Sequence, residues 1–227
     1  MSASQSPLAE WLHDRSLTLT MLALFLVCAA GQVLAGWFDF NQTATAHGEA
    51  AIALRTYVTR GHMWEALFEN WESEFLQMSA FVVLSAYLYQ VGSPESRRPR
   101  AHELVDADPR AFRDLPEVPW AVRRGGWVLR LYEYSLGGVL FLLFLAAFAG
   151  HLLGGWAELT AEQRLHGQAP DTLLDYATSS RFWFESFQNW QSEFLSVGVM
   201  VWLAVYLRQR GSPESKPVHA PHGETGR

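Results

Sequence analysis

Residues 68–76 have the sequence FENWESEFL, and residues 187–195 have the closely similar sequence FQNWQSEFL. Each copy continues directly into an apolar segment. Each apolar segment is followed by the same pentapeptide, GSPES, at residues 92–96 and 211–215. Both pairs of segments are 119 positions apart (187 − 68 and 211 − 92). Matched Trp, Phe and Pro positions in a single register indicate an internal repeat, which we interpret as a tandem duplication.

The repeat register needs no gap between residues 16 and 96, and it divides the chain of 227 residues into four parts. The expected parts are a first repeat at 1–97, an Arg- and Pro-rich connector at 98–126, a second repeat at 127–216 and a disordered tail at 217–227. The connector contains four prolines and many charged residues, so we expect at most one helical turn in it.

Apolar residues make up 49% of the chain, and they are concentrated in four segments that contain no charged residue. A helix needs about 20 apolar residues to cross the hydrocarbon core of a bilayer. The first and third segments reach that length alone. The second and fourth reach it only when the partly polar, Trp-containing residues just before them are included. The sequence therefore predicts transmembrane helices at about 16–37, 72–91, 132–156 and 191–209.

The distribution of arginine predicts the orientation of these helices. Eight arginines lie between residues 97 and 130, whereas the two hairpin loops contain two each and are richer in acidic residues. Because cytoplasmic loops carry the excess of positive charge, the connector and both termini are expected to be cytoplasmic. Each hairpin then enters and leaves on one side, so the two halves are parallel repeats. The predicted fold is an all-α integral membrane protein with two tandem hairpins in a four-helix bundle.

Short helices are expected in the outer loops of both hairpins. Residues 41–47 and 160–166 are predicted to be helical and to end at Gly48 and Gly167, because glycine is favoured just after a helix. A further short helix is expected at 172–178, with a counterpart near 51–59.

Several matched residues are predicted to pack or anchor the helices. Pairs of small residues four positions apart allow close approach of helices and make a homo-oligomer plausible; they are Gly31 with Ala35, and Gly150 with Gly154. Repeated tryptophans are expected at the membrane interfaces, in contact with the lipid bilayer; they are Trp37, Trp71, Trp156 and Trp190.

The predicted ion-binding residues are Glu74 and Glu193, together with Asn70 and Asn189. The two glutamates are repeat partners at the apolar boundary of their helices, where a carboxylate is costly to desolvate. A pseudo-twofold axis would bring them together to hold a proton or a cation. The alternative is that each carboxylate only caps amides or binds a neighbouring Trp or Asn.

The two halves are not equivalent, because Glu69 and Glu72 correspond to Gln188 and Gln191. His151 is the one histidine within a predicted transmembrane segment, and its repeat partner is Gln32. A haem with two histidine ligands is therefore not expected.

His47 and His166 are repeat partners followed by glycine, and they are the histidine candidates for a metal site with Glu74 and Glu193. No paired His-x-x-His or Glu-x-x-His motif supports such a site, and Cys28 is the sole cysteine. We therefore predict neither a metal nor a cofactor.

No nucleophile elbow, phosphate loop or dinucleotide fingerprint is present, so an enzyme is disfavoured, and no nucleic-acid partner is expected. A structural, stress-related or interaction role is favoured. The alternatives are a proton or small-ion channel or transporter that uses Glu74 and Glu193, and a membrane-embedded enzyme or metal protein. The substrate, partners, oligomeric order and physiological trigger are left open.

The segments ENWESEFL at 69–76, GSPES at 92–96 and 211–215, and WAELTAEQRLHG at 156–167 resemble a family of uncharacterised bacterial membrane proteins, domain of unknown function 6766. The resemblance covers nearly the whole chain apart from the connector and tail. It implies a multi-pass protein of the bacterial inner membrane and contributes no activity. Residues 38–46 lack the EQR pattern of the second loop.

Overall fold

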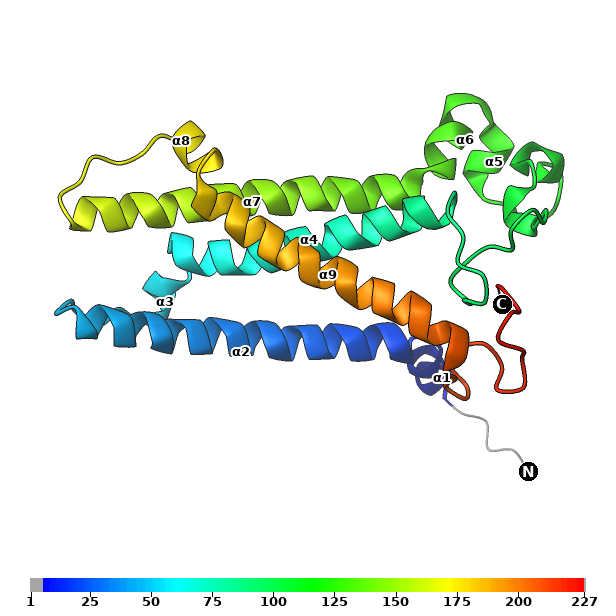
Figure 1. Cartoon of the computed structure of the whole chain (residues 1–227), viewed down its shortest axis with the longest axis horizontal. Coiled ribbons are helices and arrows are strands. Elements are labelled where there is room, and N and C mark those ends of the chain that lie inside the picture. The colour runs from blue at the N-terminus through cyan, green and yellow to red at the C-terminus, as the bar shows by residue number, and fades with distance from the viewer. Residues whose placement is uncertain (1–5, 227) are drawn as a thin grey trace. The chain divides into compact units, whose positions relative to one another are not determined.

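The computed structural model describes residues 6–226, and this part of the chain folds into nine α-helices and two short 3-10 helices (Figure 1). Residues 1–5, in the predicted first repeat, and residue 227, in the predicted tail, lie outside the described residues. The chain divides into two compact units, residues 1–64 and 65–227. The all-helical prediction is confirmed for the described residues.

The first unit consists of α1 (Pro7–Asp14), α2 (Ser16–Ala46), α3 (Leu54–Tyr57) and the start of α4 (Gly61–Ser85). The predictions that the first long helix ends near residue 37 and that 41–47 is a separate helix are wrong, because α2 is continuous through Ala46. Residues 37–46 contain neither glycine nor proline, so nothing interrupts the backbone hydrogen bonds. The helix stops at Gly48, whose φ of 81° suits glycine.

Contacts with the end of α2 hold the following loop in place. Trp37 donates its indole N–H to the carbonyl of Ile52 at 2.7 Å, and Asn41 makes two hydrogen bonds with the backbone of the same residue. The loop leads into α3, whose Tyr57 is buried and lies against Gly36. The hydroxyl of Tyr57 occupies the space that a Cβ atom at Gly36 would need.

We expect Gly36→Ala to destabilise the protein by about 1–3 kcal/mol, because the added methyl group would overlap the Tyr57 ring and hydroxyl. Thermal unfolding of the purified protein in detergent measures the change. The matched control is Gly31→Ala in the same helix, where a Cβ atom would meet none of the described atoms within 4 Å. The control should unfold at or above the wild-type temperature, since alanine favours helix over glycine by up to about 1 kcal/mol. Equal destabilisation of both variants would contradict this explanation.

The second unit contains the rest of α4 and seven further elements. These are η1 (Leu104–Asp106), η2 (Pro109–Phe112), α5 (Trp120–Arg124), α6 (Gly126–Glu133), α7 (Ser135–Leu165), α8 (Leu173–Ala177) and α9 (Ser180–Tyr206). The prediction of at most one helical turn in the connector is wrong. Two of its prolines begin helices rather than break them: Pro109 is the first residue of η2, and Pro119 is the N-cap of α5.

The repeated GSPES pentapeptide forms the same turn after α4 and after α9. Gly92 and Gly211 have φ values of 90° and 84°. The hydroxyl of Ser96 accepts a hydrogen bond from the backbone of Gln90 at 2.8 Å. The hydroxyl of Ser215 accepts the corresponding bond from Gln209 at 2.9 Å.

Both helices end earlier than the predicted spans 72–91 and 191–209, because arginine side chains cap their last carbonyls. Arg97 donates to the carbonyl of Ala86, and Arg208 donates to those of Ala204 and Val205. The tail that follows also makes contacts: Lys216 donates to three backbone carbonyls between residues 221 and 224.

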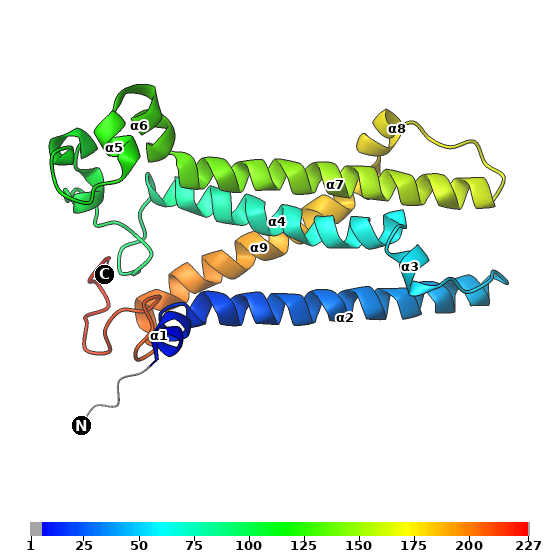
Figure 2. The ribbon, with the colours of Figure 1, turned by 180° about the vertical axis from the view of Figure 1, so that it is seen from behind.

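Within the second unit, α4 and α7 run antiparallel side by side, and α9 crosses them obliquely (Figures 1 and 2). The hydroxyl of Ser79 on α4 donates to the carbonyl of Gly137 on α7, and the ring of Phe68 fills the space beside Gly150. α9 packs on α7 through aromatic side chains, with the rings of Phe148 and Phe182 centred 5.3 Å apart. The buried side of α7 follows a helical spacing and comprises Leu140, Phe144, Ala147, His151, Gly154 and Gly155.

Two helices of the described chain, α2 and α7, are long and apolar enough to cross a membrane. The predicted spans in α4 and α9 do not reach the same hydropathy. Both of these helices begin with polar turns, which lower their mean hydropathy. In the second unit, several of those polar residues lie against α7, where they form the site described next.

Candidate functional site

His151 lies at the centre of a polar cluster on the buried side of α7. Its side chain and that of Glu72, on α4, are both 0% exposed. The Nδ1 atom of His151 lies 2.8 Å from Glu72 Oε2. An ionised carboxylate only accepts hydrogen bonds, so this contact places a proton on Nδ1. In the neutral imidazole, the lone pair is then on Nε2.

Glu72 connects all three long helices of the second unit. Its second oxygen, Oε1, accepts the indole N–H of Trp190 on α9 at 2.7 Å. Trp190 also packs edge-on against Phe144 of α7. Both carboxylate oxygens therefore have a strong donor, which offsets part of the cost of burying the group.

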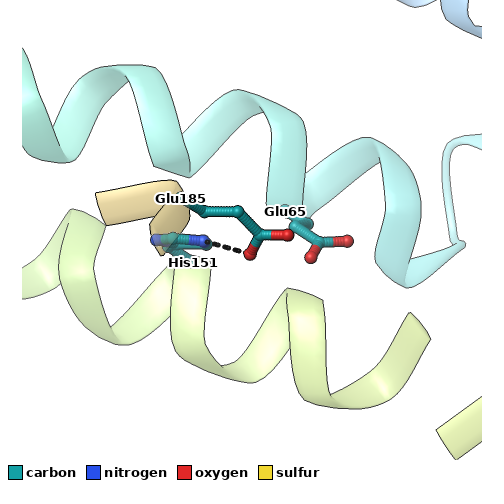
Figure 3. A group of neighbouring side chains, drawn as sticks. All are labelled: Glu65, His151 and Glu185. Carbon is teal, nitrogen blue, oxygen red and sulfur yellow. Dashed lines mark ion pairs between the residues drawn. The ribbon is translucent and has the colours of Figure 1, made fainter. Parts of the chain in front are cut away.

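The other nitrogen of His151 faces two more carboxylates, from Glu65 of α4 and Glu185 of α9 (Figure 3). Nε2 lies 3.6 Å from Glu185 Oε2 and has no hydrogen-bond partner among the described residues. One ligand atom from each of the three residues lies within 4.8 Å of the other two. The side chains of Glu65 and Glu185 are 9% and 23% exposed, so the group is largely shielded from solvent.

Tyr176 and Arg181 border the cluster at the end near α8. The Tyr176 hydroxyl lies 3.3 Å from Glu65 Oε1 and 3.5 Å from Glu185 Oε2. Arg181 donates to Glu185 Oε1 at 3.0 Å and reaches Glu65 Oε1 at 3.5 Å. Gly155 makes room for this arrangement, because a Cβ atom there would overlap the Tyr176 hydroxyl and crowd Glu65.

A fourth carboxylate, Glu69, lies one turn along α4 and accepts a hydrogen bond from the side-chain amide of Asn189. We use the name His151 cluster for Glu65, Glu69, Glu72, His151 and Glu185. Arg181, which is cationic, and His151, which can be protonated, offset at most two of the four carboxylate charges. The cluster therefore carries an excess of negative charge in a region shielded from solvent.

Burial and neighbouring charges shift the pKa values of Glu65, Glu69 and Glu185, which lie before the predicted membrane spans. Burial raises the pKa of Glu65 to about 7, against the lowering influence of Arg181. Burial also raises the pKa of Glu69, although the Asn189 amide partly opposes it. Burial alone would raise the pKa of Glu185, but the nearby His151 and the hydrogen bond and charge of Arg181 hold it below its ordinary value. Additional positive charge would therefore be favourable here.

A sequence model of the family described as "Domain of unknown function (DUF6766)" matches residues 8–227. The chain belongs to this family. The matched region includes every residue of the His151 cluster. Searches of curated proteins and of solved structures gave no significant match. The family assignment predicted from the repeated motifs is thus confirmed, and any activity of this DUF6766 domain has to be inferred from its own residues.

The predicted ion-binding residues of the DUF6766 chain lie mostly outside the His151 cluster. Glu74 is exposed, and Glu193 is close enough to interact with it electrostatically. Asn70 donates to the carbonyl of Ala66 in its own helix. Asn189 is the exception, because it binds Glu69 and the carbonyl of Glu185. The structure thus brings Glu74 near Glu193, and their ion-binding role stays a prediction.

The two histidines proposed as metal candidates occupy equivalent positions at helix ends. Each is exposed, and its Nδ1 atom contacts the carbonyl four residues earlier: Thr43 for His47, at 2.8 Å, and Glu162 for His166, at 2.9 Å. These contacts account for both side chains as caps of α2 and α7.

Three of the predicted anchor tryptophans use their indole N–H in specific hydrogen bonds. Trp37 and Trp156 bind the carbonyls of Ile52 and Asp171, and Trp190 binds Glu72. Trp71 packs edge-on against Phe68.

The predicted packing residues differ between the two long helices. Gly31 and Ala35 of α2 are exposed, whereas Gly154 of α7 is buried and Gly150 lies against Phe68. In α2 the closely packed glycine is Gly36, one position after Ala35.

The sequence did not predict a site at Glu65, His151 and Glu185. One signal pointed towards it: Glu69, Glu72 and His151 are ionisable residues whose repeat partners are all glutamines. A departure from an otherwise matched repeat marks positions where the two halves differ in chemistry. Glu65 and Glu185 gave no such signal, because they correspond to Phe184 and Ala66, and only the crossing of α9 over α4 brings them together.

Proposed function

We propose that this protein is a multi-pass protein of the bacterial inner membrane that binds a cation in the His151 cluster. The main support for this proposal is the shielded Nε2 atom of His151. This atom lacks a hydrogen-bond partner among the described residues and faces two carboxylates. A structural role accounts for the bonded Trp190–Glu72–His151 chain. Within the described part of the chain, the two further carboxylates on the other side of the imidazole share Arg181 as their one arginine partner, and a bound cation would supply more positive charge there.

Four membrane spans remain our proposal, and the cluster supports it. The polar residues that lower the hydropathy of α4 include Glu65, Glu69 and Glu72, which face α7 and α9 rather than the outside of the unit. Polar groups within a membrane protein normally face its interior in this way. α9 likewise turns Glu185 and Asn189 towards the cluster. In the proposed arrangement, the cluster residues of these two helices are therefore covered by protein rather than by lipid.

The proposed arrangement in tandem halves is supported by recurring hydrogen bonds. The bond from Trp37 to Ile52 recurs between Trp156 and Asp171, 119 positions later (156 − 37 and 171 − 52). The contact of Tyr57 with Gly36 recurs between Tyr176 and Gly155. With the arginine-rich connector and both termini in the cytoplasm, the loops that contain α3 and α8 face outward. A cation would then reach the cluster from the outer side, past Tyr176 and Arg181.

Thermal unfolding of the purified protein in nanodiscs, with a panel of monovalent and divalent cations, tests cation binding. A cation that binds only the folded protein at 100 times its Kd stabilises it by about 2.7 kcal/mol, which raises the midpoint by about 5 °C or more. We expect at least one cation to do so for the wild type, and to lose its effect in Glu65→Gln/Glu185→Gln.

A second double variant, Glu74→Gln/Glu193→Gln, separates this site from the one predicted by the sequence. Cation stabilisation should persist in it, because neither residue belongs to the His151 cluster. If stabilisation is lost in this variant and kept in Glu65→Gln/Glu185→Gln, the cation binds at the Glu74–Glu193 pair and our assignment is wrong. If no cation stabilises the wild type, the proposed function is wrong.

A further inference from the structure

We infer that Glu65, His151 and Glu185 are three ligands for a divalent transition-metal ion, with Glu72 as the residue that positions the imidazole. This inference rests on the proposed cation-binding function and specifies its ligand. It also assigns a metal site to residues that the sequence analysis did not associate with one.

The three side chains are nearly close enough to share one ion. Zinc binds nitrogen and oxygen ligands at about 2.0–2.2 Å, which places the ligand atoms of a tetrahedral site roughly 3.4 Å apart. The His151 Nε2 and Glu185 Oε2 atoms are already 3.6 Å apart, and all three ligand atoms lie within 4.8 Å. Side-chain rotation of Glu65, which comes from the facing turn of α4, would close the remaining gap.

The imidazole is also held in the orientation and tautomer that a metal requires. Metal-binding histidines usually donate their other ring N–H to a carboxylate or a carbonyl group, which fixes the ring and raises its basicity. Glu72 provides this contact at 2.8 Å, and Trp190 in turn holds Glu72. Buried polar atoms are nearly always paired, so an unpaired Nε2 directed at two carboxylates is unusual in a purely structural arrangement.

The donor set indicates the class of metal. Imidazole nitrogen is a good ligand for Zn²⁺, Fe²⁺, Ni²⁺ and Co²⁺, whereas Mg²⁺ and Ca²⁺ favour sites made of oxygen alone. Two carboxylates with one imidazole also match the charge of a divalent ion. The Tyr176 hydroxyl, which contacts both carboxylates, marks the side where a fourth ligand such as water would lie. Three protein ligands with an open fourth position are typical of zinc sites that exchange or act on a ligand.

Arg181 contacts both carboxylates that we assign to the metal. Its guanidinium group contacts Glu65 and Glu185, and it also reaches Glu162 Oε2 at 3.7 Å. Arg181 is partly exposed, with 43% of its side chain accessible. It can therefore move towards Glu162 when a metal ion takes its place between the two cluster carboxylates.

Titration of the detergent-purified, metal-free full-length protein with Zn²⁺ and Co²⁺ tests the inference. Calorimetry gives the stoichiometry for Zn²⁺, and the visible absorption of Co²⁺ reports its coordination geometry. We expect one ion per chain and a Co²⁺ spectrum typical of four-coordinate nitrogen and oxygen ligation. His151→Gln and Glu65→Gln should each weaken binding by 100-fold or more. Glu72→Gln should weaken it about 10–100-fold and alter the Co²⁺ spectrum, as expected for a positioning residue.

The matched control is His166→Gln, which removes an exposed histidine of the same helix and should leave affinity unchanged. Circular dichroism and size-exclusion chromatography identify the variants that remain folded, and Glu185→Gln replaces any ligand variant that does not. Zn²⁺ binding that persists at wild-type affinity in folded ligand variants would overturn the inference. If only Na⁺, K⁺, Mg²⁺ or Ca²⁺ stabilises the protein through Glu65 and Glu185, the cation-binding function holds and the transition-metal assignment is wrong.

Discussion

Glu72→Ala is expected to reduce the free energy of unfolding by about 3 kcal/mol or more. The substitution removes the acceptor for both the His151 ring N–H and the Trp190 indole N–H. Each donor is then left unsatisfied away from water, which costs about 1–3 kcal/mol.

Unfolding of the purified protein in mixed micelles, followed by circular dichroism, measures this loss. The control is Glu74→Ala, two positions along the same helix, where the side chain is exposed and the change should stay within about 0.5 kcal/mol. Glu72→Gln should lie between the two, because its amide oxygen can still accept one of the hydrogen bonds. Similar stability of the Glu72→Ala and Glu74→Ala variants would show that Glu72 does not join α4 to α7 and α9.

Arg181→Gln is expected to strengthen Zn²⁺ binding about tenfold or more. The guanidinium of Arg181 contacts the same two carboxylates that we assign to the metal, so it competes with the ion for them. Removing it leaves Glu65 and Glu185 without that counter-charge. The metal-free variant should therefore be less stable than the wild type, because two shielded carboxylates then repel each other.

The opposite signs of these two effects make the prediction specific. Zn²⁺ titration measures the gain in affinity, and thermal unfolding in the presence of a chelator measures the loss of stability. The control is Arg164→Gln, an exposed arginine near the end of α7, which should change neither quantity appreciably. If Arg181→Gln weakens Zn²⁺ binding, the arginine supports the metal site rather than competing with it.

The main features of the fold follow from short-range signals in the sequence. Apolar segments without charge predicted the long helices. Gly48 and Gly167 were correctly predicted to stop helices, but they follow the continuous α2 and α7 rather than the separate short helices expected at 41–47 and 160–166. Helix ends without such a marker were harder to place. α4 and α9 end where arginine side chains from the following turn cap the backbone, and that depends on tertiary contacts.

The number of membrane-crossing helices illustrates a second difficulty. Mean hydropathy treats a buried glutamate and a lipid-facing one alike. It therefore selects α2 and α7 but not α4, whose Glu65 and Glu72 lie inside the second unit. The sequence alone does not reveal which side of a helix is covered. The structure places Glu65 and Glu72 in the interior of the second unit, and a membrane crossing by α4 remains a proposal.

The candidate site was only partly accessible from the sequence. Glu69, Glu72 and His151 each correspond to a glutamine in the other half. A comparison of the two halves could therefore have identified these three residues as candidates for a site. The repeat instead points to Glu74 and Glu193, because these two residues match between the halves. The site is formed by residues that the two halves do not share.

In each half, a tyrosine packs against a glycine of the long helix: Tyr57 against Gly36, and Tyr176 against Gly155. Tyr57 and Tyr176 use the same glycine-made gap, but one hydroxyl meets His62 and the other meets carboxylates. The supporting framework is thus built twice, while the charged groups are installed once. The first half supplies Glu65, Glu69 and Glu72 to the cluster and the second half supplies His151 and Glu185, and these groups gather beside Tyr176. The surroundings of Tyr57 can therefore serve as an internal reference for the effect of the charges that gather around Tyr176.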